Sequence, residues 1–162
     1  MFTYQGSVIQ NERLAKGADH CGSEGMVFAL RDLIKDGQIM DPRAMAEPLT
    51  AGRTFGTSAP VLIYAVDTKF SIHVGFDGIC GQSNAVKHET LFHNADVRAA
   101  GDLEVFEGMI VTVNDHSGSY GTAGRLDTDR RFAEAVLTAI DDAGAPVYAS
   151  ERVRLRSKAG RR

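Results

Sequence analysis

Three residues between positions 88 and 120 have side chains that could take part in a chemical reaction. His88 titrates near neutral pH, Asp102 supplies a carboxylate, and Tyr120 supplies an aromatic hydroxyl. A histidine and a carboxylate can transfer protons or stabilise a cationic transition state, and a tyrosine ring can stack on a base or a nicotinamide. We predict that these three residues form the catalytic group. The alternative for each is structural: a strand histidine bonded to a carbonyl, a turn aspartate, and a tyrosine that pins the turn to the core.

Polar residues nearby would hold the ligand. Ser117 and Ser119 lie in the segment 114–120, which follows an apolar strand and is rich in hydrogen-bond donors and acceptors. Arg98 could bind a phosphate through its guanidinium, although a plain surface arginine is the alternative. We therefore predict cofactor contacts for Ser117, Ser119 and Arg98. His73 and His116 are interpreted as surface or core residues.

No metal site is predicted. The five histidines lack the spacing of a metal-binding pair, and the two cysteines, Cys21 and Cys80, form neither a zinc motif nor a disulfide framework. We expect both thiols to be reduced. Cys21 follows His20 at the start of a predicted helix, where a thiol can become nucleophilic. Because adjacent residues rarely orient as a nucleophile and its base, this candidate ranks below the catalytic group.

The charge of the chain is uneven along its length. The formal net charge is −3, yet six of the 18 basic residues stand within the last twelve positions. Most of the surface would therefore repel phosphate, which excludes a uniformly basic nucleic-acid binder. The tail leaves two interpretations open: a solvated final strand, or a local strip in which Arg152, Arg154 and Arg156 contact nucleic acid.

Apolar residues near the N-terminus recur at helical spacing. Ser23 suits an N-cap, and Gly37 ends the run, so the spacing predicts a helix over 24–36. Its apolar face would consist of Met26, Val27, Leu30, Leu33 and Ile34. Residues 41–60 are rich in Gly, Pro, Ser and Thr, which predicts a loop that shapes or covers a site.

The pattern changes to that of a sheet after Pro60. The predicted strands span 61–66, 70–74, 86–92, 97–106 and 109–114. A tight turn is expected at 67–69, and Gly108 would supply the positive φ for the hairpin turn at 107–108. Residues 99–101, Ala-Ala-Gly, have no bulk, so another backbone or a ligand could approach this strand closely.

A second helix and a final strand complete the predicted order. The helix would be capped by Asp127 or Thr128 and end at Gly144. Its buried face would consist of Phe132, Val136, Ala139 and Ile140. The strand would begin at Pro146 and turn its apolar residues to one side. These are Val147, Ala149, Val153 and Leu155, with Tyr148, Arg152, Arg154 and Arg156 on the other side.

Together these elements predict one α+β domain over 1–162, with a mostly antiparallel sheet and two main helices packed on one face or end. We expect a helical and loop part over 1–59, and a sheet core with one helix over 60–156. No apolar run reaches the ~20 residues of a membrane span, and the first residues do not form a Sec-type signal peptide. We expect a cytoplasmic protein, or one delivered to the cytosol of a target cell by a non-Sec route.

Several parts of the segment 60–150 form a combined pattern. His88 matches the second histidine of His-His-Ser-Ser-Phe-Leu-x-Gly, and residues 99–101 match Ala-Ala-Gly-Glu-Leu. Ser117-Gly118 and Tyr120 match Ser-Gly-His-Tyr-x-Pro. In this combination the segment resembles a domain of plant calmodulin-binding proteins that contain an IQ motif. It also resembles bacterial proteins that look like C-terminal domains of polymorphic toxins and effectors.

The sequence departs from that pattern at positions that bear on chemistry. Asp102 replaces the glutamate, which shortens the reach of the carboxylate by one methylene. Ser119 replaces the histidine, which removes a group that titrates near neutral pH. Residues 89–90 and 121–122 differ as well. Ile9-Gln10 lacks the basic residue of an IQ motif, so calmodulin binding is not implied.

The resemblance implies a small effector-like or toxin-like domain that acts on a macromolecule. The first hypothesis is an ADP-ribosyltransferase-like enzyme that uses NAD and modifies a protein target, with Asp102 stabilising the ribosyl cation. The second is a metal-independent ribonuclease in which His88 and Asp102 form the acid–base pair. The third is a binding or regulatory module that kept the fold and lost the chemistry, as the changes at Asp102 and Ser119 suggest.

Overall fold

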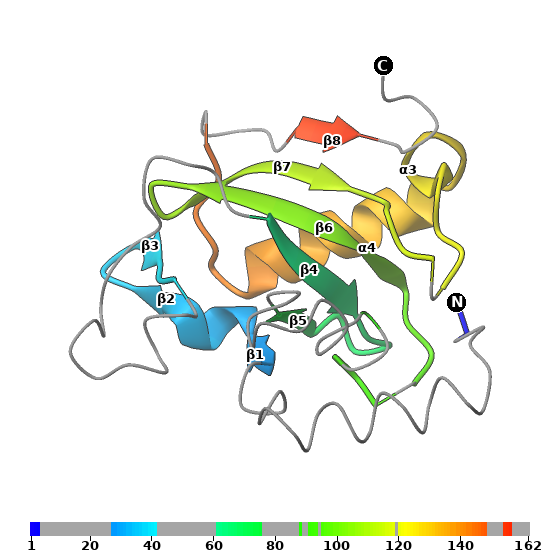
Figure 1. The fold of residues 1–162 in the computed structure, drawn as a ribbon, viewed down its shortest axis with the longest axis horizontal. Helices are drawn as coiled ribbons and strands as arrows, with labels where there is room; N and C mark the ends of the chain where they lie inside the picture. The colour runs from blue at the N-terminus through cyan, green and yellow to red at the C-terminus, as the bar shows by residue number, and fades with distance from the viewer. Residues whose placement is uncertain are drawn as a thin grey trace.

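The computed structural model of the protein describes residues 1–3, 27–41, 61–75, 88, 91–93, 95–118, 120–148 and 154–156, the last as backbone only. Within these residues the chain forms a six-stranded sheet, a separate two-stranded sheet and short and long helices (Figure 1). In spatial order, the larger sheet consists of β1 (Val27–Ala29), β5 (Ile72–Gly75), β4 (Val61–Val66), β6 (Ala99–Phe106), β7 (Met109–Asn114) and β8 (Arg154–Arg156).

The strands of the larger sheet are mostly antiparallel. β4 pairs with β6 from Val61↔Glu104 to Val66↔Ala99, and β8 alone runs parallel to its neighbour, β7. The turn between β4 and β5 is fixed by Asp67, whose carboxylate accepts hydrogen bonds at 2.9 Å from the backbone N–H groups of Lys69 and Ser71. The predicted α+β fold, its mostly antiparallel sheet and its tight turn at 67–69 are confirmed.

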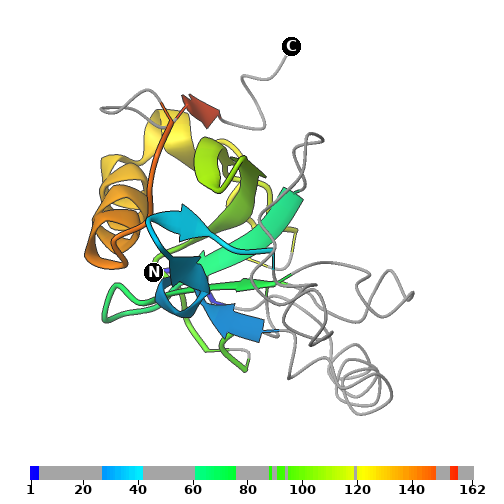
Figure 2. The same cartoon turned by 90° about the vertical axis from the view of Figure 1, so that its left-hand side faces the viewer.

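The long helix α4 (Arg130–Asp142) covers one face of this sheet (Figure 2). Its apolar stripe is the predicted one, and all four predicted residues are buried: Phe132, Val136, Ala139 and Ile140. They pack on Leu62, Tyr64, Leu103 and other residues that β4 and β6 turn toward the helix. Among the described residues, no helix is long and apolar enough to span a bilayer.

The start of α4 differs from the prediction by one or two residues. Its N-cap is Asp129, whose carboxylate accepts from the backbone N–H groups of Arg131 and Phe132. Asp127 and Thr128 lie instead inside a separate one-turn helix, α3 (Arg125–Thr128). The extended backbone of Asp129 separates the two helices, which is the conformation that an N-cap requires.

The helix predicted over 24–36 is wrong for residues 27–36, and residues 24–26 lie outside the described part. Residues 27–29 form β1, which pairs with β5, and residues 30–33 form a single 3-10 turn, η2 (Leu30–Leu33). β2 (Ile34–Lys35) and β3 (Gln38–Ile39) then make the two-stranded sheet. A 3-10 turn places residues three apart on one side. Leu30 and Leu33 are both buried there, which accounts for the helix-like apolar spacing.

Two further strand predictions need correction. The strand predicted over 86–92 is wrong at its described residues, because His88 lies in a 3-10 turn and Leu91 and Phe92 lie in a turn. The final strand is interrupted: Val147 makes an isolated parallel bridge with Ile110, Tyr148 is in a turn, and β8 follows. The predicted facing of Ala149, Arg152 and Val153, and of the β8 side chains, lies outside the described residues, as does most of the loop predicted over 41–60.

The hairpin of β6 and β7 is the predicted one. Both of its turn residues, Glu107 (φ 51°) and Gly108 (φ 79°), adopt a positive φ. A side chain at Gly108 would also collide with β3, since a Cβ there would lie 2.7 Å from the Cβ of Gln38. The adjacent Ile39 N–H donates to the Gly108 carbonyl at 2.8 Å, so this turn docks the small sheet against the large one.

Candidate functional site

The candidate site lies on the face of the sheet opposite α4. Successive residues of a strand point to opposite faces. On β6, Ala99 and Leu103 pack in the core beneath α4, whereas Ala100 packs in a second cluster together with Ile63 and Ala65 of β4. Asp102 is two residues beyond Ala100 and is paired with Ile63, so it belongs to the same face. The site is therefore built on the two central strands.

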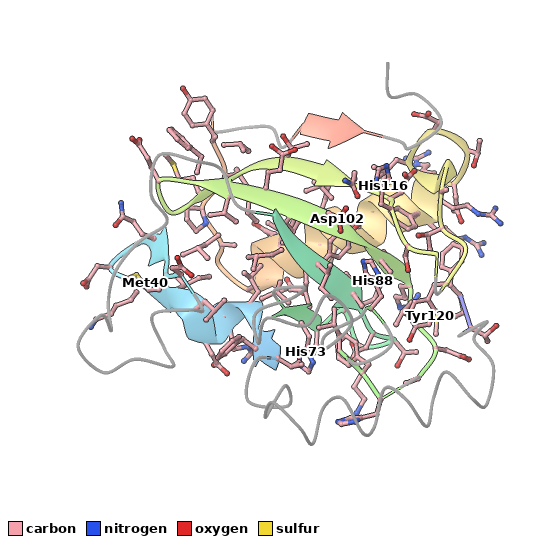
Figure 3. The ribbon with its side chains drawn as sticks, in the orientation of Figure 1. Met40, His73, His88, Asp102, His116 and Tyr120 are labelled. Carbon is pink, nitrogen blue, oxygen red and sulfur yellow. The ribbon has the colours of Figure 1, made fainter. Side chains whose placement is uncertain are left out.

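The Asp102 carboxylate stands between two imidazoles. One oxygen, Oδ1, lies 3.9 Å from Nε2 of His88, and the other, Oδ2, lies 3.8 Å from Nδ1 of His116. The carboxylate and the His116 side chain are each about one-fifth exposed, while His88 is almost fully buried. Figure 3 shows the three residues in one region of the sheet. Two imidazoles thus face one carboxylate, one at each of its oxygens.

His88 is held by the strand that carries Asp102. Its Nε2 lies 2.8 Å from the carbonyl oxygen of Gly101, one residue before the carboxylate. A carbonyl oxygen can only accept, so Nε2 carries the hydrogen of this bond. In the neutral ring Nδ1 is then the basic nitrogen. The bond fixes the orientation of the ring and presents the Nε2 side of the imidazole to Asp102.

His116 is held by the turn that follows β7. Its backbone N–H donates to Oδ1 of Asn114 at 2.9 Å. The same turn is tied to β6 by Thr122, whose hydroxyl lies 3.0 Å from the Ala100 carbonyl and 2.9 Å from the Asp115 carbonyl. Asp115, fully buried, accepts from the backbone N–H of Leu126 at the start of α3. Hydrogen bonds thus connect the turn to β6 on one side and to α3 on the other, and they fix the backbone that carries His116.

Gly101 lets the two strands approach closely beneath the site. A Cβ at this position would lie 2.1 Å from the carbonyl oxygen of Asn114 and 3.0 Å from the ring of Tyr64. The Tyr64 hydroxyl uses this space to donate to the Asn114 carbonyl at 2.8 Å. The close approach expected at the small residues 99–101 is made at Gly101 by the Asn114 backbone and the Tyr64 ring.

The pKa of Tyr64, which lies on the core side of the site, is affected by the carboxylates around it. Burial raises the pKa of its phenol well above the ordinary value, and the nearby carboxylates of Asp115 and Asp102 raise it further. The phenol consequently stays protonated and keeps its hydrogen bond to the Asn114 carbonyl throughout the neutral range.

Two of the other predicted site residues, Tyr120 and Ser117, make contacts that hold the fold together. The Tyr120 ring is buried in the second cluster, and its hydroxyl donates to the Ala95 carbonyl at 2.9 Å. In Figure 3 it lies apart from Asp102 and His116. Ser117 is buried, and its hydroxyl oxygen accepts from the backbone N–H of Tyr120. Ser119 lies outside the described residues.

Arg98 directly precedes β6, and its side chain contacts the turn between β4 and β5. Its Nε donates to the Thr68 carbonyl at 3.0 Å, and its guanidinium lies 4.4 Å from the centre of the Phe70 ring. It lines an open cavity of about 540 Å³ at the N-terminal end of α4, whose lining does not include Asp102 or either neighbouring histidine. Arg98 is therefore not brought together with the catalytic candidates.

His116 and Asn114 are the members of the site that sequence reasoning missed. The resemblance places a histidine at position 119, where this chain has serine, but His116 supplies an imidazole from the same turn, three residues earlier. A hairpin with only the two-residue turn at 107–108 would place Val113 opposite Asp102. The register shifts by one residue between Glu104 and Val105, so Leu103 pairs with Val113 and Asn114 reaches Asp102. The hairpin prediction did not contain this shift and could not place Asn114 beside Asp102.

The described residues contain no group of three or more His, Cys, Asp or Glu side chains arranged to hold a metal ion. Cys21 and Cys80 are outside them. In comparisons with known proteins, the sequence matches no family model, no curated protein and no solved structure.

Proposed function

We propose that this protein is an effector-type transferase that breaks the glycosidic bond of NAD and transfers the ADP-ribosyl group to a protein target. The observation that supports this proposal is the Asp102 carboxylate between His88 and His116, at 3.9 and 3.8 Å. Such a domain would act in a cytosol, either its own or that of a target cell.

The negative charge of the Asp102 carboxylate distinguishes between the two reactions considered, cleavage of a ribosyl bond and cleavage of RNA. Cleavage of a ribosyl bond passes through an oxocarbenium-like cation, which a neighbouring carboxylate stabilises. Cleavage of RNA places additional negative charge on a phosphate, which the same carboxylate would oppose. Asp102 is partly shielded from water, so its charge acts at reduced dielectric screening. The arrangement favours ribosyl chemistry over phosphodiester chemistry.

The proposed reaction balances with the groups that the site contains. The bond between C1′ of the nicotinamide ribose and the nicotinamide nitrogen breaks, and its electron pair leaves on nicotinamide, which becomes neutral. A nucleophilic atom of the target forms the new bond to C1′ and releases a proton. His116 would accept that proton, while His88, whose Nε2 hydrogen is bonded to the Gly101 carbonyl, would hold the backbone of β6 beside the carboxylate. Tyr120 has no part in this proposal, because its ring is buried.

The test is nicotinamide release from NAD, together with transfer of label from adenylate-labelled NAD to proteins of a cell extract. Asp102→Asn should lower both by about 100-fold or more, because it removes the charge that stabilises the cation. The matched control is Glu104→Gln, which makes the same charge change two residues along β6. If the wild-type protein releases no nicotinamide and NAD does not raise its melting temperature, the proposal is wrong. Metal-independent cleavage of RNA in a parallel assay would instead support the ribonuclease hypothesis.

A non-catalytic binding module is the second candidate, and one contact favours it. The 2.8 Å bond between His88 Nε2 and the Gly101 carbonyl can be explained entirely as a structural link between the turn at residue 88 and β6. This candidate expects His88→Gln to lower the melting temperature while no NAD turnover exists to be lost. A turnover that disappears in Asp102→Asn and persists in Glu104→Gln would exclude it.

A further inference from the structure

Asn114 takes part in four hydrogen bonds in and beneath this site. Its side-chain Nδ2 donates to Oδ2 of Asp102 at 3.2 Å. Its Oδ1 accepts from two backbone N–H groups, those of Asp102 and His116, each at 2.9 Å. Its own carbonyl accepts from the buried hydroxyl of Tyr64 at 2.8 Å. One residue therefore connects the core, the carboxylate and the turn that holds an imidazole.

These contacts determine which oxygen of the Asp102 carboxylate faces His88 and which faces His116. Asn114 binds Oδ2, the oxygen that also faces His116, and so limits rotation of the carboxylate about its terminal bond. Oδ1 is thereby left on the His88 side. The two acceptor contacts of Asn114 Oδ1 fix the backbone of β6 and of the turn at the same time. An amide is suited to this position because it donates and accepts through one rigid group.

We propose that Asn114 is the positioning residue of the site, which holds the Asp102 carboxylate between His88 and His116. Its effect on turnover rests on the proposed NAD reaction, but its effect on the carboxylate and the imidazole does not. The side chain has two separable functions: the Nδ2 donor orients the carboxylate, and the Oδ1 acceptor anchors the turn.

Two substitutions separate these functions. Asn114→Asp keeps an oxygen that can accept from both backbone N–H groups, but it replaces the donor with a second carboxylate oxygen facing Asp102. Asn114→Ala removes both functions. The matched control is Thr112→Val, a nearly isosteric change on the same strand and the same face, two residues before Asn114. We expect the control to keep a melting temperature close to that of the wild-type protein. Asn114→Ala should lower it because both contacts are lost, and Asn114→Asp should lower it because the two carboxylates repel each other.

The first readout follows the His116 ring by NMR during a pH titration and needs no activity. Among the described side chains, the ionisable neighbours of this ring include Asp102 at 3.8 Å and, across that carboxylate, His88. Asn114→Asp should raise the titration midpoint of His116, because a second carboxylate favours the imidazolium. Asn114→Ala should shift it to the value measured in Asp102→Asn, because the ring and the carboxylate are no longer held together. Midpoints equal to that of Thr112→Val in both variants would overturn the proposal.

The second readout is the kinetics of NAD consumption. Asn114→Asp should lower kcat by about 10- to 100-fold with a smaller change in KM, because a misoriented carboxylate stabilises the transition state less while the binding surface remains. Equal kcat in Asn114→Asp and Thr112→Val would also overturn the positioning role. If the wild-type protein consumes no NAD, the proposed function fails, and the NMR titration still decides whether Asn114 positions the carboxylate.

Discussion

Gly101 is the residue whose side chain the site can least accommodate. Gly101→Ala would place a Cβ 2.1 Å from the Asn114 carbonyl oxygen, which is backbone and cannot rotate away. We expect the substitution to lower the free energy of unfolding by about 3 kcal/mol, because β6 and β7 must separate to admit the methyl group. Urea denaturation measures this change.

Gly118→Ala is the matched control for that measurement. No atom lies within 4 Å of a Cβ built at Gly118, and its φ is not in the positive region. Alanine should therefore leave the stability unchanged or raise it by a few tenths of a kcal/mol through the unfolded state. An equal loss of stability in the two variants would show that the strand approach at Gly101 is not as tight as described.

The identities of the site residues were only partly predictable, for a reason that His116 and Tyr120 illustrate. Residue types and the Ala-Ala-Gly pattern were sufficient to select His88 and Asp102, which the structure places within 3.9 Å of each other. In the turn after β7, however, sequence gives no direct indication of which polar side chain points at the carboxylate and which ring points into the core. That choice depends on contacts such as those of Thr122 and Asn114, which form only after the hairpin register is set.

The junction between α3 and α4 is defined by a single carboxylate. Asp129→Ala should lower the free energy of unfolding by about 1 kcal/mol, because the backbone N–H groups of Arg131 and Phe132 lose their acceptor. Asp127→Ala is the control, since it removes the same charge from the interior of α3. Thermal or urea unfolding of both variants checks the assignment. A larger loss in Asp127→Ala would restore the cap position predicted from the sequence.

Elements with their own repeating pattern were predictable, and elements that depend on a distant partner were not. α4 and the β6–β7 hairpin combine a strong apolar period with a local cap or turn, and their predictions hold. Residues 27–35 have a helix-like spacing, yet β5 offers Val27–Ala29 a strand partner more than forty residues away in sequence. The register of that pairing is a tertiary contact, so the local period alone could not reveal it.

The two faces of the sheet are connected through Tyr64, which links the packing beneath α4 to the charges of the site. The ring lies in the core with Leu62, Phe132 and other residues, and its hydroxyl passes Gly101 to reach the backbone of Asn114. Burial and the carboxylates of Asp115 and Asp102 raise the pKa of this phenol well above its ordinary value. Part of the dependence of stability on alkaline pH should therefore come from Tyr64.

A phenol with a raised pKa in the folded state keeps its proton at pH values where the unfolded chain loses it. Below about pH 10 both states are protonated and Tyr64 contributes its full stability. Above that pH, unfolding releases the proton, and stability should fall by up to about 1.4 kcal/mol per pH unit. Tyr64→Phe should be less stable near pH 8, by about 1 kcal/mol for the lost hydrogen bond, and should lack this part of the alkaline decline. Urea unfolding from pH 8 to 11 measures both effects, with the half-exposed Tyr148→Phe as the control. A parallel alkaline decline in Tyr64→Phe and in the wild-type protein would mean that Tyr64 does not link the core to the carboxylates.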